Sequence, residues 1–194
     1  MRHNMKFLVI DTESGSRKPE STLLSAAFLV YNDNFQLIDS LDLRLKPDTD
    51  CLYIVDAQGM AVNKISLVVH DKVAITYKQA KPLLFDFLKK NSLDGHLTPL
   101  GHAVKGDINR IVDNIISIGS WEQFCTYHFI DTSVVLQYLR VLGKMPPDCD
   151  GSIEALCKYF RINQKAGDDA QFHEALFDAK MTMAVFKKMV ELGK

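Results

Sequence analysis

The chain has 194 residues, a length that favours a single domain, residues 1–194, with a substantial core. Apolar residues make up 47% of it and charged residues 24%, a composition typical of ordinary globular proteins and not of low-complexity chains. The formal net charge of −1 argues against a protein that holds long nucleic acid through a broad basic surface, although an enzyme could still bind a few nucleotides through metal ions.

Neither a membrane segment nor a zinc site is indicated. No apolar run approaches the length of a transmembrane helix. Residues 1–6 lead into the first expected strand without the apolar stretch of a signal peptide. The four cysteines have no CxxC spacing, which favours reduced thiols over zinc ligands. We therefore expect a cytoplasmic protein that makes no contact with membranes.

Two acidic residues follow a short apolar run near the N-terminus. Residues 7–10 (Phe-Leu-Val-Ile) are typical of a strand that is buried on both faces. Because side chains alternate along a strand, Asp11 and Glu13 should point the same way. Two carboxylates on one face repel each other unless a cation lies between them, and a hard cation such as Mg²⁺ prefers oxygen ligands. The alternative at this point is a solvated strand end whose acids face water.

The rest of the sequence predicts strands first, and alternating helices and strands afterwards. Residues 23–31 and 35–45 form a strand-turn-strand pair around a turn at residues 32–34, and Pro47 ends it. The expected helices lie at residues 56–62, 77–90, 107–116, 132–142, 152–160 and 174–192, and the expected later strands at residues 97–101 and 127–130. This order predicts an α/β fold in which helices pack on a mixed sheet.

Two further acids and a histidine are ambiguous when each is taken alone. Asp107 opens a predicted helix, where an aspartate is also favoured simply as a cap. Asp178 lies inside the last predicted helix beside Ala179, so its carboxylate would be partly desolvated. His173 cannot share a helix face with Asp178, since five helical steps turn about 140°. It can reach the same site only if it lies on a loop before the helix, and residues 167–169 (Gly-Asp-Asp) are consistent with such a loop. The alternative is an exposed histidine and an aspartate that pairs with a nearby lysine.

Taken together, these segments resemble the DEDDh exonucleases. The resemblance rests on Asp-x-Glu after an apolar first strand, Gly-His and then Asp at a middle helix, and His-x4-Asp at the last helix, in the family's order over nearly the whole chain. The segments that carry it are residues 7–13, 101–107, 129–132 and 173–179, and residues 60–65 resemble the segment that contacts the terminal base. The family includes the epsilon proofreading subunit of bacterial DNA polymerase III and ribonuclease T.

The resemblance implies a ribonuclease H-like sheet, in which three antiparallel early strands are followed by parallel ones. It also implies two Mg²⁺ or Mn²⁺ ions, which would be held by the four motif acids, Asp11, Glu13, Asp107 and Asp178. His173 would take a proton from the attacking water. The implied activity is 3′→5′ hydrolysis of single-stranded DNA or short oligonucleotides to nucleoside 5′-monophosphates, as in proofreading or DNA repair. The expected substrate contacts are Thr12, Val62 and Asn63.

The sequence departs from the family pattern at several positions. Ala103 and Gly106 stand where an Asn and a Phe are usual, and the missing aromatic should weaken or reshape stacking on the terminal base. Residues 14–16 read Ser-Gly-Ser in place of Thr-Thr-Gly, Ser25 replaces a Glu, and Lys64 stands where a Gly is common. None of these positions is an expected metal ligand, so they bear on substrate preference more than on activity.

Other functions remain as alternatives. RNA is an alternative substrate, because the motif does not read the 2′-OH. A non-catalytic module that binds a DNA polymerase is a hypothesis from another class, and the end of the chain at Lys194, soon after the last helix, favours a free-standing enzyme over it. A zinc-dependent or cysteine-nucleophile hydrolase is disfavoured, because Cys157 is expected in the core and His102 and His128 are expected to be structural.

Overall fold

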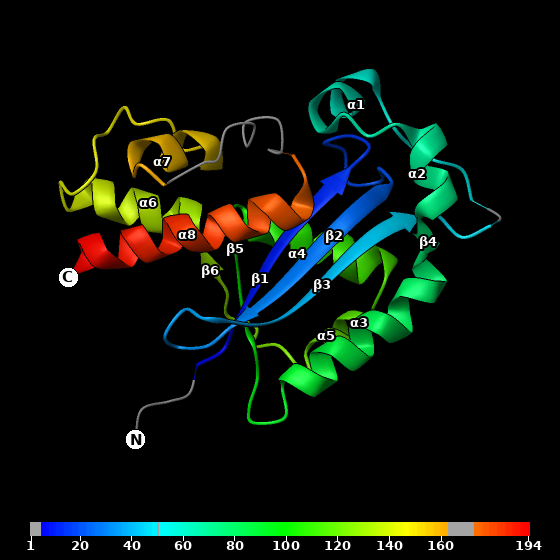
Figure 1. Ribbon diagram of the computed structural model, residues 1–194, viewed down its shortest axis with the longest axis horizontal. Coiled ribbons are helices and arrows are strands. Elements are labelled where there is room, and N and C mark those ends of the chain that lie inside the picture. The colour runs from blue at the N-terminus through cyan, green and yellow to red at the C-terminus, as the bar shows by residue number, and fades with distance from the viewer. Residues whose placement is uncertain (1–4, 50, 163–172) are drawn as a thin grey trace.

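A mixed β-sheet with helices on both faces forms the centre of the molecule (Figure 1). The computed structural model describes residues 5–49, 51–162 and 173–194. The strands of this part of the chain are β1 Phe7–Ser14, β2 Leu23–Tyr31, β3 Leu37–Lys46, β4 Ile75–Thr76, β5 Thr98–Gly101 and β6 Ile130–Asp131. Their order across the sheet is β4-β3-β2-β1-β5-β6. Strands β1 to β3 pair antiparallel and β1, β5 and β6 pair parallel, which confirms the predicted mixed sheet.

Helices cover the two faces of the sheet unequally. They are α1 Ala57–Asn63, α2 Leu67–Val73, α3 Tyr77–Asn91, α4 Val104–Asn114, α5 Ile118–Trp121, α6 Thr132–Val141, α7 Ile153–Tyr159 and α8 Ala175–Gly193. Helices α3, α4 and α5 pack on one face, and α8 packs on the other with α6 and α7 beside it (Figure 1). In the described part of the chain, no helix has both the length and the apolar character needed to span a bilayer.

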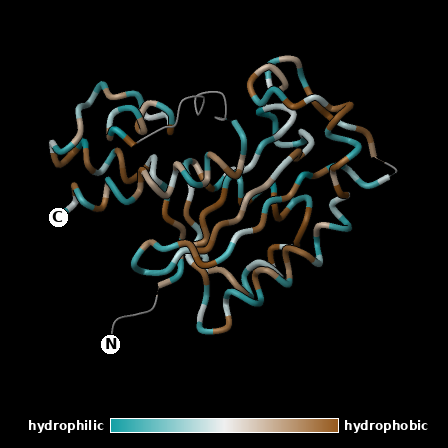
Figure 2. Tube along the Cα trace, viewed as in Figure 1, coloured by the Kyte–Doolittle hydropathy of each residue, from teal (hydrophilic) through white to brown (hydrophobic). Residues whose placement is uncertain are grey.

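Strand β1 lies in the middle of the sheet, and its residues alternate between the two faces. Leu8 and Ile10 belong to the core under α3 and α4, whereas Phe7 and Val9 belong to the core under α8. The hydropathy colouring accordingly shows brown along the central strands (Figure 2). Because the period of a strand is two, Asp11 and Glu13 continue the row of Phe7 and Val9 toward α8.

Helix α4 begins at Val104, three residues earlier than the predicted start at Asp107. Ala103 precedes it in the left-handed region (φ 57°) and donates its backbone N–H to Asp131 Oδ1 at 3.0 Å. Val104 then packs against Gly101, where a Cβ atom would lie 2.6 Å from Val104 Cγ2. The predicted boundary was wrong because this cap has no side-chain signature, and Asp107 is in the first turn instead of capping the helix.

The later strands are shorter than predicted. The predicted strand at residues 127–130 was wrong at its start, since β6 contains only Ile130 and Asp131. Tyr127 is 79% exposed, and its ring contacts the ring of the neighbouring His128 (centroids 3.8 Å apart, planes tilted by 39°). Helices α2 and α5 and strand β4 were not predicted, because each is too short for an apolar period to be recognised.

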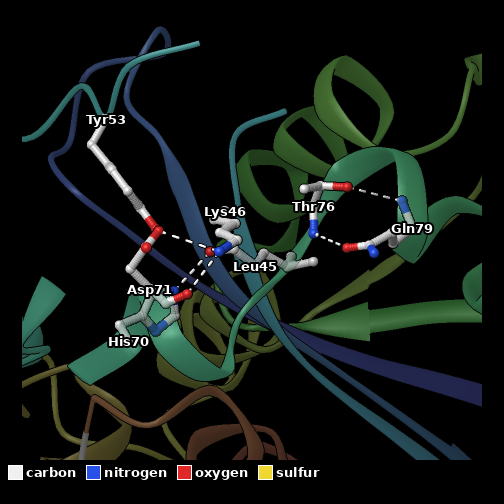
Figure 3. A network of polar contacts seen from close by, with 7 residues as sticks. All are labelled: Leu45, Lys46, Tyr53, His70, Asp71, Thr76 and Gln79. Atoms are coloured by element: carbon white, nitrogen blue, oxygen red, sulfur yellow. Dashed lines mark hydrogen bonds and ion pairs between the residues drawn. The ribbon is translucent and has the colours of Figure 1, made fainter. Parts of the chain in front are cut away.

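Helix α2 is fixed to the edge of the sheet by a polar network (Figure 3). Lys46 Nζ donates to the Asp71 backbone carbonyl at 2.7 Å, and Tyr53 OH donates to Asp71 Oδ1 at 2.9 Å. The buried His70 places Nε2 2.7 Å from the Leu45 carbonyl, which can only accept, so Nε2 carries the proton. Thr76 and Gln79 form a reciprocal capping box that starts α3 beside this network. The short helix is thereby held against β3.

Helix α1 lies against the carboxyl end of β1 through a close approach of two backbone segments. A Cβ atom on Gly59 would lie 2.4 Å from the Gly15 carbonyl oxygen, so only glycine fits there. Asp56 caps α1 by accepting the Gly59 N–H at 2.7 Å, and its own N–H donates to Gly15 O at 2.9 Å. Asn63 Nδ2 donates to Ser14 O at 3.0 Å. These contacts place α1 beside the end of β1, where the candidate site lies.

Candidate active site

Four carboxyl groups from three elements meet at the carboxyl end of β1. Asp11 and Glu13 come from β1, Asp107 from the first turn of α4, and Asp178 from the first turn of α8. Burial, followed by the charges of Asp107, Asp178 and Glu13, raises the pKa of the Asp11 carboxyl. The structure therefore brings together the four acids that the sequence analysis selected, and Asp11 and Glu13 share one strand face as predicted.

Burial disfavours the charged form of every acid in this cluster, and repulsion between cluster members adds to it for Asp11 and Glu13. Desolvation, followed by the charges of Asp178 and Asp107, raises the pKa of Glu13 to about 8. Desolvation raises the pKa of Asp178 to about 6, against the lowering effect of the His173 N–H. Burial also raises the pKa of Asp11 and Asp107. Four such groups can all be ionised at neutral pH only if something positive lies among them.

His173 lies next to Asp178 although the two are five residues apart. His173 precedes α8 in the left-handed region (φ 73°), and its backbone N–H donates to Asp178 Oδ2 at 3.0 Å. Ligand atoms of His173, Glu13 and Asp178 all lie within 4.8 Å of one another. His173 therefore reaches the acids from the segment before the helix, as predicted; residues 167–169, which supported that prediction, lie outside the described residues, as do residues 1–4.

Asp107 is held by a neighbour that the sequence analysis had assigned to substrate binding. Thr12 points to the opposite face of β1 from Asp11, and its Oγ1 donates to Asp107 Oδ1 at 2.5 Å. This hydrogen bond, followed by the charge of Arg110, counteracts the rise that burial causes in the pKa of Asp107. The Arg110 guanidinium also donates to the backbone carbonyls of Ser16 and Lys18 at 3.3 and 3.4 Å. The sequence analysis missed Arg110, whose one signal was its position one turn after Asp107.

A cavity of about 300 Å³ opens beside Glu13, between the end of β1 and helix α1. It is lined by all three residues expected to contact substrate, Thr12, Val62 and Asn63. Val62 is 40% exposed, so it can offer apolar surface there. Asn63 is buried, and its side chain bridges Ser14 O and the Ile65 N–H, so its polar atoms fix the backbone.

The residues of the acid cluster fit a divalent cation. Asp178 Oδ1 is buried and has no hydrogen-bond partner among the described residues, an arrangement that costs free energy unless an ion or water binds it. Glu13 and His173 offer ligand atoms within 4.8 Å of this carboxyl. Carboxylate oxygens are the ligands that Mg²⁺ and Mn²⁺ prefer. Among the described residues, Glu13, Asp178 and His173 thus have ligand atoms close enough to share one ion, and Asp11 and Asp107 adjoin them.

We expect these ions to stabilise the protein far more at pH 8 than at pH 5. The folded chain keeps protons on these carboxyls that the unfolded chain loses between about pH 4 and pH 8, so without metal its stability falls as pH rises through that window. At 100 times the dissociation constant, one ion contributes about 2.7 kcal/mol, or roughly 5–10 °C in Tm for a chain of this size. Differential scanning fluorimetry of EDTA-dialysed protein, with and without Mn²⁺, measures both effects.

The exposed acid Asp113, on the same helix as Asp107, gives the control for this experiment. Asp113→Asn should keep the full metal-induced shift, whereas Asp178→Asn should lose most of it. Equal shifts at pH 5 and pH 8, or an equal loss in both variants, would contradict binding at the acid cluster.

Comparison by sequence finds no matching family model and no matching curated protein. The structure is similar to exonuclease I from Methylocaldum szegediense, with a TM-score of 0.72 and 17% identity over 93% of this chain and 39% of that one. It is similar to E. coli exonuclease I in complex with a dT13 oligonucleotide (TM-score 0.70, 16% identity, 94% of this chain and 40% of that one). It is also similar to the nuclease domain of 3′hExo, a DEDDh family member, bound to rAMP (TM-score 0.69, 13% identity, 99% and 94%).

This chain spans about two fifths of the length of the exonuclease I chains and nearly all of the 3′hExo nuclease domain. At identities of 13–17%, what the chain shares with these structures is the arrangement of its strands and helices. The sheet order and the helices on both faces agree with the architecture that the motifs predicted. The chain therefore has the ribonuclease H-like fold of these exonuclease structures.

Proposed function

We propose that this chain is a metal-dependent 3′→5′ exonuclease of the DEDDh type that releases nucleoside 5′-monophosphates from single-stranded nucleic acid. The observation that carries the proposal is the cluster of four partly or fully desolvated carboxyls, with an imidazole within 4.8 Å of two of them. The cluster lies at the carboxyl end of the central strand, in the same fold as exonucleases whose structures contain dT13 or rAMP.

In this proposal Asp11, Glu13, Asp107 and Asp178 hold two divalent ions. Such ions supply charge neutralisation on the phosphoryl oxygens and lower the pKa of a nearby water molecule. Asp178 has two tasks, because Oδ2 accepts the His173 N–H while the buried Oδ1 stays available as a ligand. Thr12 orients the Asp107 carboxylate through a 2.5 Å hydrogen bond.

His173 is proposed to take the proton from the attacking water. A general base must lie within hydrogen-bond reach of the proton that it abstracts, and the exposed ring of His173 borders the acids without being packed into the core. The hydrogen bond between its backbone and Asp178 keeps the ring at this edge of the cluster.

The 300 Å³ cavity beside Glu13 is proposed to bind the 3′-terminal nucleotide. Its volume is at the lower end of the range for small-ligand pockets, about 300–1,000 Å³, which suits one nucleotide. Val62 offers apolar surface to the base, and Arg17 and Lys18 line the same cavity with positive charge for phosphate. Arg110 ties the loop that carries these two cations to helix α4.

An oligonucleotide assay tests this function. We expect a 5′-labelled single-stranded dT oligonucleotide to shorten one nucleotide at a time in Mg²⁺ or Mn²⁺, and not in EDTA. A 3′-labelled copy should release its label as the first product, which separates 3′→5′ from 5′→3′ hydrolysis.

The same assay on the RNA counterpart, run side by side, decides between DNA and the alternative RNA substrate. No shortening of either polymer with any divalent ion would refute the proposal. A DNA polymerase that co-purifies with an inactive chain would favour the binding-module hypothesis instead.

A further inference from the structure

Lys64 has a backbone conformation that the residue itself disfavours. It ends helix α1 in the left-handed region (φ 56°, ψ 18°), with its N–H donating to Met60 O. Glycine is the usual residue at such a helix end, because a Cβ atom makes this conformation costly. A non-glycine residue held there is a reason to look for a function of its side chain.

Lys64 lines a second cavity, of about 520 Å³, that lies between strands β2 and β3 and the start of α8. Arg44 and Asp42 line it as well, and the pKa of Asp42 is raised by burial and lowered by the charges of Arg44 and Lys180. The charges of Arg44 and Lys180 are thus partly balanced by the carboxylate of Asp42. Lys64 forms no ion pair with any described residue, so its ammonium group is available to a ligand.

The two cavities adjoin the acid cluster from different sides. Asn63 lines both of them, Glu13 lines the smaller one, and His173 lines the larger one. Because Glu13 and His173 have ligand atoms within 4.8 Å of each other, the reacting phosphodiester would lie where the cavities meet. A strand whose last nucleotide fills the smaller cavity would then continue into the larger one. One wall of that cavity includes His70, which the network around α2 holds in place (Figure 3).

We propose that Lys64 binds the phosphate of the next internucleotide linkage, on the 5′ side of the bond that is cleaved. This inference rests on the proposed exonuclease function. It makes Lys64 a determinant of substrate length: a substrate with two linkages gains the contact, and a substrate with one does not.

Replacement of Lys64 by glycine tests this, because it should stabilise the folded protein while it weakens substrate binding. Lys64→Gly should raise the Tm, because glycine adopts a φ of 56° without strain. It should raise KM for a dT trinucleotide or longer strand by about 3- to 10-fold, the loss expected for one charge contact with phosphate. Hydrolysis of the p-nitrophenyl ester of thymidine 5′-monophosphate, which has a single phosphodiester, should not change. The slope of log KM against log salt should decrease by about 0.7.

Arg161 gives a matched control, since it is also an exposed cation at a positive φ (52°) and lines neither cavity. Arg161→Gly should leave KM unchanged for every substrate, and Lys64→Arg should keep most of the length preference. The proposal is overturned if Lys64→Gly leaves the KM for the trinucleotide unchanged, raises the KM for the p-nitrophenyl ester by the same factor, or lowers the Tm. If no substrate is hydrolysed, the exonuclease proposal fails by itself; anisotropy of a labelled dT pentamer in Ca²⁺ then decides whether Lys64→Gly weakens binding.

Discussion

Replacing Asp11 by asparagine is expected to reduce kcat/KM by about three orders of magnitude while making the folded protein more stable at pH 8. The loss follows because a metal ligand disappears, and bound metal provides several kcal/mol of charge stabilisation in phosphoryl transfer, at about 1.4 kcal/mol for each factor of ten. The gain follows because Asp11 is desolvated and faces the charges of Asp107, Asp178 and Glu13. The amide keeps the shape of the side chain and removes one of these like charges.

The stability difference between Asp11→Asn and the unchanged protein should itself depend on pH. Because burial and the neighbouring charges raise the pKa of the Asp11 carboxyl, the unchanged protein loses stability as the pH rises from 5 to 8, and the variant should lose less. At pH 8 the variant should therefore melt at least 2–4 °C higher, the shift that about 1 kcal/mol produces in a chain of this size. Thermal melts in EDTA at both pH values measure this, beside steady-state hydrolysis of a dT oligonucleotide in Mg²⁺.

Asp113→Asn is again the matched control, because Asp113 is an exposed acid on α4 that should change neither activity nor Tm. A variant at Asp11 that loses activity and stability together would indicate a structural role for this residue. An Asp11→Asn variant that stays active would show that Asp11 is not a metal ligand of the proposed site.

The sheet and the acids were predictable from the sequence because their signals are strong and local. The alternation along β1 placed Asp11 and Glu13 on one face, and the structure confirms that both face the α8 side. The apolar runs gave β2 and β3 almost to the residue. The short elements α2, α5 and β4 carried no such signal. The position of α2 depends on contacts of Asp71 with Lys46 and Tyr53, which are distant from it in sequence.

Two departures from the family pattern have a backbone explanation that the sequence alone could not supply. Ala103, where an Asn is usual, and Lys64, where a Gly is common, both lie in the left-handed region (φ 57° and 56°). Asn and Gly are the residues that tolerate this region best, so the pattern at these positions reflects the path of the chain. Gly106 differs, since a Cβ atom there would meet nothing within 4 Å. Its backbone does not require glycine, so a larger side chain could be added there to test the expected effect on base stacking.

Replacing His173 by glycine is expected to lower kcat by about 10²- to 10⁴-fold with little change in KM, the usual contribution of a general base. Glycine adopts the φ of 73° without strain and keeps the backbone N–H that donates to Asp178 Oδ2. The variant should therefore retain the geometry of Asp178 while losing the ring. Imidazole added to the medium should restore part of the lost rate, measured on a labelled dT oligonucleotide. His96→Gly, which alters an exposed histidine in the turn before β5, should have no effect on kcat.

The same variant separates two roles that the geometry of His173 allows. Its ring lies within 4.8 Å of Glu13 and Asp178, close enough to act as a base toward water or as a third ligand to an ion. If His173 is the base, the metal-induced rise in Tm should persist in His173→Gly, in contrast to Asp178→Asn, and only the rate should fall. If the rise disappears together with the activity and imidazole restores both, His173 is a ligand. The exposure of His173 favours the first outcome, because a ring that reaches solvent can pass its proton on to water after each turnover, whereas a coordinated imidazole has no free nitrogen facing the attacking water.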